Sequence, residues 1–96
     1  MHIKHSVYGF DFEIPDVLQG QLEAWEREME SVNITIGDIR LSIFSGIVVR
    51  AAIKVGWIPP EVAKLEDIDK MNPGVIIYLS RKISELVSDA REIPPE

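Results

Sequence analysis

The sequence predicts a mostly helical α+β domain, in which an N-terminal β-ribbon is followed by three main helices with an apolar helix at the centre. Apolar residues alternate with acidic ones near the N-terminus, and they recur every three or four residues in two later segments, which are the periods of a strand and of a helix. Between those segments, residues 39–58 (IRLSIFSGIVVRAAIKVGWI) are apolar nearly all round. A helix of this kind must be buried on most sides, so we expect it at the centre. The chain of 96 residues suits one domain.

The ribbon is predicted over residues 1–14. Phe10, Phe12 and Ile14 alternate with two acids, which is typical of a half-buried strand. The residues before Gly9 supply its partner strand. Because a two-stranded ribbon is marginal alone, it must pack on the helices or pair with another chain through its exposed edge.

An acidic helix is predicted over residues 15–31. Pro15 and Asp16 suit its first turn, since proline fits the first helical position and an acid favours the positive end of the helix dipole. An apolar stripe at helical spacing follows: Leu18, Leu22, Trp25 and Met29. The stripe should face the core, and Trp25 is expected to be a core residue rather than a contact residue.

The apolar central helix is predicted over residues 36–56. Thr35 followed by Asp38 resembles a capping box at its start, and Gly56 supplies a left-handed terminator at its end. The helix carries Arg50 and Lys54, which are expected to face the acidic first helix.

The C-terminal part is predicted to contain a connector, a helix and a tail. Residues 57–72 form the connector, with a short helical turn in its polar part. Asn72 and Pro73 are a strong start signal for an amphipathic helix over residues 73–91. The proline-rich residues 92–96 cannot continue that helix and form an extended tail.

The net charge of −6 argues against nucleic-acid binding. Between Asp11 and Glu30 there are seven acids against Arg27 alone, so this segment carries the whole excess. An acidic face repels phosphate backbones. Two interpretations stay open for it: a solvated helix face, or an acidic docking surface for a basic partner.

The central apolar stretch is not expected to cross a membrane. Arg50 and Lys54 lie within it, and a cation at a bilayer centre costs about 2.5–3.5 kcal/mol. Its uncharged run, residues 41–49, rises only about 13 Å as a helix. The N-terminus lacks the apolar core of a signal peptide, and the absence of cysteine fits a reducing compartment. We therefore expect a cytoplasmic protein.

Three groups of residues carry potential chemistry: the histidines His2 and His5, the glutamates Glu23, Glu26 and Glu30, and the serines Ser42 and Ser45. The histidines fall on opposite faces of a strand, and no cysteine assists them as a metal ligand. The glutamates lack the Glu-x-x-His partners of di-iron sites and suit a solvated face. The serines lie in the apolar helix, where packing or bonding to the preceding turn is expected. The sequence therefore predicts no enzyme, no metal and no cofactor.

Two stretches of the chain resemble the small tail assembly chaperones of long-tailed bacteriophages and prophages. The first is Ile14-Pro15-Asp16 followed by the helix Gln21-Leu22-Glu23-Ala24-Trp25-Glu26, and the second runs from Asn72-Pro73 through an amphipathic helix to Ile93-Pro94-Pro95-Glu96. The resemblance implies a non-enzymatic protein that holds the tape measure protein before the tail tube polymerises around it. The sequence differs from many members at Val17-Leu18-Gln19-Gly20, where they have Leu-Thr-Val before Gln-Leu-Glu.

The expected client contacts are Phe44, Val48, Trp57 and Ile58. We expect these residues to form the side of the central apolar stretch that the flanking helices leave uncovered. Homo-oligomerisation through this surface or through the edge strand is a companion expectation. Two alternatives stay open. One is a homo-oligomeric structural or adaptor protein of phage origin without chaperone activity, and the other is an enzyme or metal protein that uses the histidines and glutamates.

Overall fold

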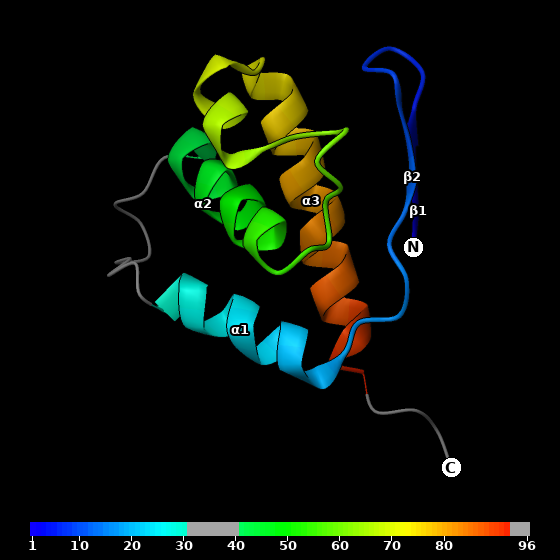
Figure 1. Ribbon diagram of the computed structural model, residues 1–96, viewed down its shortest axis with the longest axis vertical. Helices are drawn as coiled ribbons and strands as arrows, with labels where there is room; N and C mark the ends of the chain where they lie inside the picture. The colour runs from blue at the N-terminus through cyan, green and yellow to red at the C-terminus, as the bar shows by residue number, and fades with distance from the viewer. Residues whose placement is uncertain (31–40, 93–96) are drawn as a thin grey trace.

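A computed structural model describes residues 1–30 and 41–92 of the chain. Its elements, in chain order, are β1 (His2–His5), β2 (Phe10–Glu13), α1 (Gln19–Glu30), α2 (Leu41–Lys54), the 3-10 helix η1 (Leu65–Lys70) and α3 (Pro73–Ala90). In Figure 1, α2 lies beside α3, the β-hairpin runs along the other side of α3, and α1 crosses below α2. The predicted fold class, mostly helical α+β with an N-terminal ribbon, is confirmed.

The ribbon is an antiparallel hairpin in which Ile3 pairs with Phe12. Gly9 occupies the turn with a φ of 75°, which is a left-handed conformation that glycine adopts without strain. Ile3 and Ile14 are fully buried, and Phe12 packs against the same core. The period-two pattern therefore has its predicted consequence, a half-buried ribbon that packs on the helices.

An aromatic cluster joins the hairpin to α3. The ring of His5 stacks on Tyr8 at 4.4 Å and meets Tyr78 edge-on at 4.7 Å. The ring of Phe10 stacks on the ring of Tyr78, with 6.5 Å between their centroids. The Tyr78 hydroxyl also donates a hydrogen bond to the carbonyl of Lys4 at 3.3 Å. Tyr78 is thus the α3 residue that fixes the position of the hairpin.

Helix α1 begins at Gln19, later than residue 15, where the sequence predicted its start. Leu18 is its N-cap, since the carbonyl of Leu18 accepts from the amide of Leu22 at 3.0 Å. The side chain of Gln21 reaches back to the amide of Leu18 at 3.1 Å, as the third residue of a capping box does. Leu18 is 64% exposed, so the predicted apolar stripe loses its first member.

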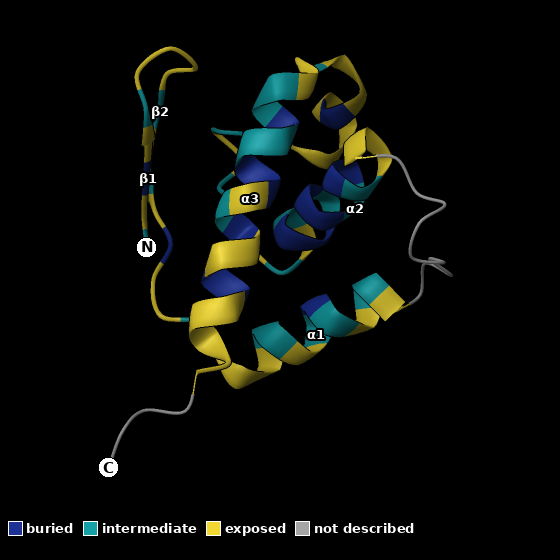
Figure 2. Ribbon diagram, turned by 180° about the vertical axis from the view of Figure 1, so that it is seen from behind, coloured by how far each residue is buried: buried dark blue, intermediate teal, exposed yellow. Residues whose placement is uncertain are grey.

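Helix α2 is the most buried helix, as its composition predicts, and it packs chiefly on α3. Figure 2 shows it in dark blue and teal for most of its length. The predicted helix start at residue 36 and its Thr35–Asp38 cap lie outside the described residues. Lys54 faces α1, as expected, and pairs with Glu28 at 3.0 Å. Arg50 instead turns to the 3-10 helix η1 and pairs with Asp69 at 2.7 Å.

Helix α2 ends in a Schellman motif built on Gly56. This residue has a φ of 88°, and its amide donates to the carbonyl of Ile53 at 3.1 Å. The amide of Trp57 donates to the carbonyl of Ala52 at 3.0 Å, which completes the pair of bonds that defines the motif. The turn folds the chain back over the end of the helix, so Trp57 is brought onto the core.

This turn makes part of the predicted contact surface wrong. Trp57 and Ile58 are only 3% and 2% exposed, and Val48 on α2 is 1% exposed. The indole of Trp57 packs against Trp25 with 6.1 Å between the ring centroids. Of the four expected contact residues, Phe44 alone is half-buried rather than buried.

Helix α3 begins where the sequence predicted. The Asn72 side chain accepts a hydrogen bond from the amide of Gly74 at 2.8 Å, and Pro73 occupies the first turn. The helical turn predicted in the connector is η1. Most of the tail predicted over residues 92–96 lies outside the described residues. Among the residues described, no helix combines the length and the apolar character needed to cross a membrane.

Candidate protein-interaction surface

The first half of α2 leaves large apolar side chains in solvent. Leu41 is 59% exposed and Ile43 is 55% exposed, while Phe44 and Ile47 are half-buried. The apolar residues in the second half of the same helix are mostly buried. The exposed apolar surface of α2 is therefore concentrated at one end of the helix.

This end of α2 forms one wall of a groove with α3, which we call the α2–α3 groove. It has a volume of about 350 Å³. The lining residues are Leu41, Phe44 and Ser45 from α2, and Ile77, Ser80, Arg81, Ser84 and Glu85 from α3. Three large apolar side chains form the walls, and one cation and one anion stand on the α3 side. The groove thus has the apolar interior and charged rim that are typical of a protein-binding surface.

A buried hydroxyl without a partner lines the α2–α3 groove. Ser45 is 1% exposed, and its Oγ has no hydrogen-bond partner in the described part of the chain. Buried polar groups are nearly always hydrogen-bonded, and leaving one unpaired costs about 1–3 kcal/mol. Because the oxygen is itself buried, a bound partner could satisfy it only after neighbouring side chains move.

A second hollow of about 240 Å³ continues from the first toward the end of α3. It is lined by Trp25 of α1 and by Ser84, Val87, Ser88 and Arg91. Ser84 lines both hollows, so the two are contiguous along α3. The Trp25 side chain is also buried with its Nε1 unpaired. At the rim, Arg91 pairs with Glu26 at 3.2 Å and ties α1 to the end of α3.

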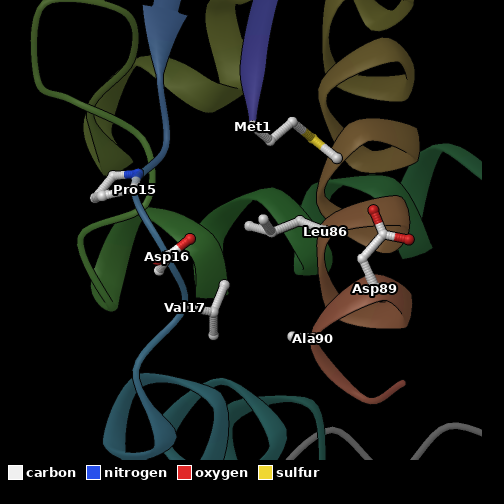
Figure 3. Close-up of a pocket in the computed structure, with 7 residues that line it drawn as sticks. All are labelled: Met1, Pro15, Asp16, Val17, Leu86, Asp89 and Ala90. Carbon is white, nitrogen blue, oxygen red and sulfur yellow. The ribbon is translucent and has the colours of Figure 1, made fainter. Parts of the chain in front are cut away.

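A third hollow lies where the segment after the hairpin passes the last turns of α3 (Figure 3). Its volume is about 390 Å³. Met1, Val17 and Leu86 give it an apolar interior, and the carboxylates of Asp16 and Asp89 lie on opposite sides of it. Both aspartates are exposed. Two solvated carboxylates at an apolar hollow do not define a ligand, so we assign none to it.

A fourth hollow of about 380 Å³ lies at the other end of α2, beside the turn that follows Gly56. The buried Ile58 lines it, and Leu65 stands beside it with 43% of its surface exposed. No unpaired buried polar atom lines this hollow among the described residues. It is a second apolar surface of similar size, at the opposite end of α2 from the α2–α3 groove.

The histidines and glutamates that could supply metal or acid–base chemistry are dispersed. The ring of His2 contacts the Asp11 carboxylate at 2.5 Å, and that hydrogen bond lowers the pKa of Asp11. The ring of His5 lies in the aromatic cluster instead. Glu26 pairs with α3, and Glu28 pairs with α2, on two different sides of α1. Within the described residues, no cluster of three potential metal-binding side chains is found.

Sequence reasoning found one groove residue, Phe44, and missed the others. Leu41 and Ile77 lie in apolar or amphipathic helices, where periodicity did not distinguish them from core residues. A signal that could have found the α3 side of the groove is a spacing of four, at which Ser80, Ser84 and Ser88 recur one turn apart. The buried Ser80 and the exposed Ser84 line the α2–α3 groove, and Ser84 and Ser88 line the second hollow beside Trp25.

Comparison with known proteins finds no matching family, no similar curated protein and no similar solved structure.

Proposed function

We propose that this chain is a non-enzymatic tail assembly chaperone of a bacteriophage or prophage, which binds a helical segment of the tape measure protein during tail morphogenesis. The observation that carries the proposal is the α2–α3 groove, which is apolar, open and lined by the unpaired hydroxyl of Ser45. The resemblance of the sequence to the chaperone family supplies the class of client.

The groove suits reversible binding. Apolar contact contributes about 25 cal/mol per Å² before the cost of association, so a small groove yields moderate affinity. A chaperone that leaves before the virion matures requires such a contact rather than a permanent interface. Leu41, Ile43 and Phe44 supply the apolar contact area.

The charge of the protein supports the same role. Helix α1 holds four glutamates and one arginine, and the chain carries a net charge of −6. A net charge of this size keeps a protein with exposed apolar side chains soluble, and it disfavours acidic partners. The proposed site of action is the cytoplasm of the bacterial host.

A homo-oligomeric structural or adaptor protein of phage origin is the second candidate. The observation in its favour is the hairpin, since in the described residues each strand pairs only with the other and leaves an edge without a partner strand. Such edges are templates for pairing with another chain. A stable oligomer with no affinity for a tape measure segment would favour this candidate.

Co-expression tests the proposal. The gene next to this chain is expected to encode a very long helical protein, which is produced alone and together with this chain. The chaperone is expected to raise the soluble fraction of the long protein and to co-purify with it. If the long protein is equally soluble and unbound in both cases, the proposal is wrong.

A further inference from the structure

Helix α1 buries far less of itself than the other two long helices. Trp25 is the only buried residue of α1, and Leu22 and Met29 are half-buried against the core. Helices α2 and α3 have six buried residues each. The side chain of Gln21 adds one hydrogen bond, to the carbonyl of Val55 at 3.3 Å. Because buried apolar area is the main source of stability, α1 is held less firmly than α2 and α3.

The ion pairs that join α1 to the other helices are exposed. Glu26 pairs with Arg91 of α3 at 3.2 Å, and Glu28 pairs with Lys54 of α2 at 3.0 Å. These four side chains are between 39% and 55% exposed. Water competes for both charges of an exposed pair, so such pairs stabilise a contact only weakly.

The contact of α1 with the core also leaves two indole N–H groups without a partner. The rings of Trp25 and Trp57 lie 6.1 Å apart, and the Nε1 atoms of both are buried and unpaired within the described residues. A buried donor that loses its bond to water and gains no other destabilises the arrangement that buries it. Movement of α1 away from the core would return water to Trp25 and Trp57.

The surface beneath α1 continues the α2–α3 groove. Val87 of α3 is only 3% exposed and lines the second hollow together with Trp25. Ser84 lines both this hollow and the groove. In Figure 2, α1 crosses below the dark blue, buried part of α2. Movement of α1 would therefore expose Val87 and Trp57 and lengthen the apolar groove.

We propose that α1 is a strap, which opens as a unit from an intact α2–α3 pair and thereby extends the groove. Elements with few buried apolar contacts open at a lower free energy than the whole domain unfolds. The opening itself needs no partner. Its role in admitting the client rests on the chaperone function proposed above.

Single thiols can measure the opening, since the chain contains no cysteine. Val87→Cys places a thiol beneath the strap. Val49→Cys makes the same substitution at a fully buried position of α2. Val49 lies one turn beyond Ser45 and Gly46, which line hollows on the two sides of the α2–α3 contact. It therefore reports on separation of α2 from α3. A thiol reagent labels each variant at increasing urea concentrations below the unfolding transition.

The strap predicts different labelling at the two positions. Val87→Cys is expected to react about tenfold or more faster than Val49→Cys, after correction for the global stability of each variant. Its rate should also depend less steeply on urea, because opening of α1 exposes less surface than global unfolding. Equal corrected rates with equal urea dependence would show that α1 leaves the core only when the whole domain unfolds, and the proposal would be wrong.

Removal of the two ion pairs provides the second readout. Glu26→Gln combined with Glu28→Gln is expected to raise the labelling rate of Val87→Cys about threefold or more. Glu61→Gln combined with Glu66→Gln removes the same charge from exposed positions in the connector and η1, and should leave the rate unchanged. Circular dichroism checks that both double variants keep the fold. No increase, or an equal increase in the control, would overturn the proposal.

The affinity for a tape measure segment tests the role of the strap in binding. A protein that binds only in its open state gains apparent affinity in proportion to the open fraction, so the double variant of α1 should lower the Kd about threefold. An unchanged Kd despite faster labelling would overturn this role. If the strap opens as expected but no segment binds the wild type, the chaperone function is wrong and the strap remains. If a segment binds and the strap does not open, the strap alone is wrong.

Discussion

At the scale of single residues, the described part of the chain holds three buried side-chain polar atoms without partners: Trp25 Nε1, Ser45 Oγ and Trp57 Nε1. Trp57 lies in the core against Trp25 and lines none of the four hollows considered above. Ser45 and Trp25 instead line contiguous hollows beside α3. The unpaired atoms of both residues are themselves buried, so a bound partner reaches them only if neighbouring side chains move.

The hydroxyl of Ser45 is expected to destabilise the free protein. Ser45→Ala removes a buried group that has no partner, and the free energy of unfolding should rise by about 1 kcal/mol beyond the helix-propensity gain. Ser84→Ala is the control, since it makes the same change at an exposed helical position and contributes only the propensity gain of about 0.5 kcal/mol. Urea unfolding of both variants measures the difference. If Ser45→Ala is no more stable than Ser84→Ala, the hydroxyl of Ser45 has a hydrogen-bond partner in solution and the prediction is wrong.

The pair of His2 and Asp11 makes the ribbon sensitive to acid. The hydrogen bond from His2 holds the pKa of Asp11 below its ordinary value of 3.8 in the folded chain. The ionised carboxylate therefore stabilises the fold above pH 3.8, and this contribution is lost as the pH falls through the lower folded pKa. The difference in unfolding free energy between the wild type and Asp11→Asn should shrink over that range. Asp16→Asn is the control for charge, and a difference that does not vary with pH would contradict the prediction.

At the scale of the elements, the turn after α2 determines what the central helix can expose. Gly56 adopts a left-handed conformation that costs other residues about 1–2 kcal/mol, so Gly56→Ala should lower the free energy of unfolding by about that amount. Gly20→Ala is the matched control, because an added Cβ at Gly20 in α1 meets no atom within 4 Å. That variant should be neutral or up to about 0.5 kcal/mol more stable. Thermal unfolding compares the two, and an equal loss at both positions would rule out this role of the turn.

Local signals in the sequence predicted the elements well where one residue determines the local structure. Asn72 with Pro73 fixed the start of α3, and Gly56 fixed the end of α2, since cap geometry depends on a few neighbouring atoms. The start of α1 was wrong because the side chain of Gln21 caps the helix at Leu18, three residues after Pro15. Several residues there suited a helix start, and composition did not distinguish among them.

At the scale of the whole molecule, the fold leaves the side chains of Leu41 and Ile43 exposed at one end of α2. The hairpin covers the far side of α3, and α1 crosses the other end of α2, as Figures 1 and 2 show. Periodicity predicted which side chains of each helix are apolar, but not which side of α2 each neighbour covers. The burial of Trp57 and the exposure of Leu41 both depend on that arrangement. For this reason three of the four contact residues predicted from the sequence, Val48, Trp57 and Ile58, are buried.

Binding of a tape measure segment to the wild type and to two matched variants distinguishes the two ends of α2. Leu41→Asp places a charge in the α2–α3 groove, and Leu65→Asp places the same charge at the hollow beside Ile58; both leucines are exposed, by 59% and 43%. The Kd of the segment is measured by titration for each protein after circular dichroism has shown that the fold is kept. We expect Leu41→Asp to raise the Kd about tenfold or more and Leu65→Asp to leave it within about twofold of the wild-type value. An unchanged Kd for Leu41→Asp, or a larger loss for Leu65→Asp, would contradict binding at the α2–α3 groove.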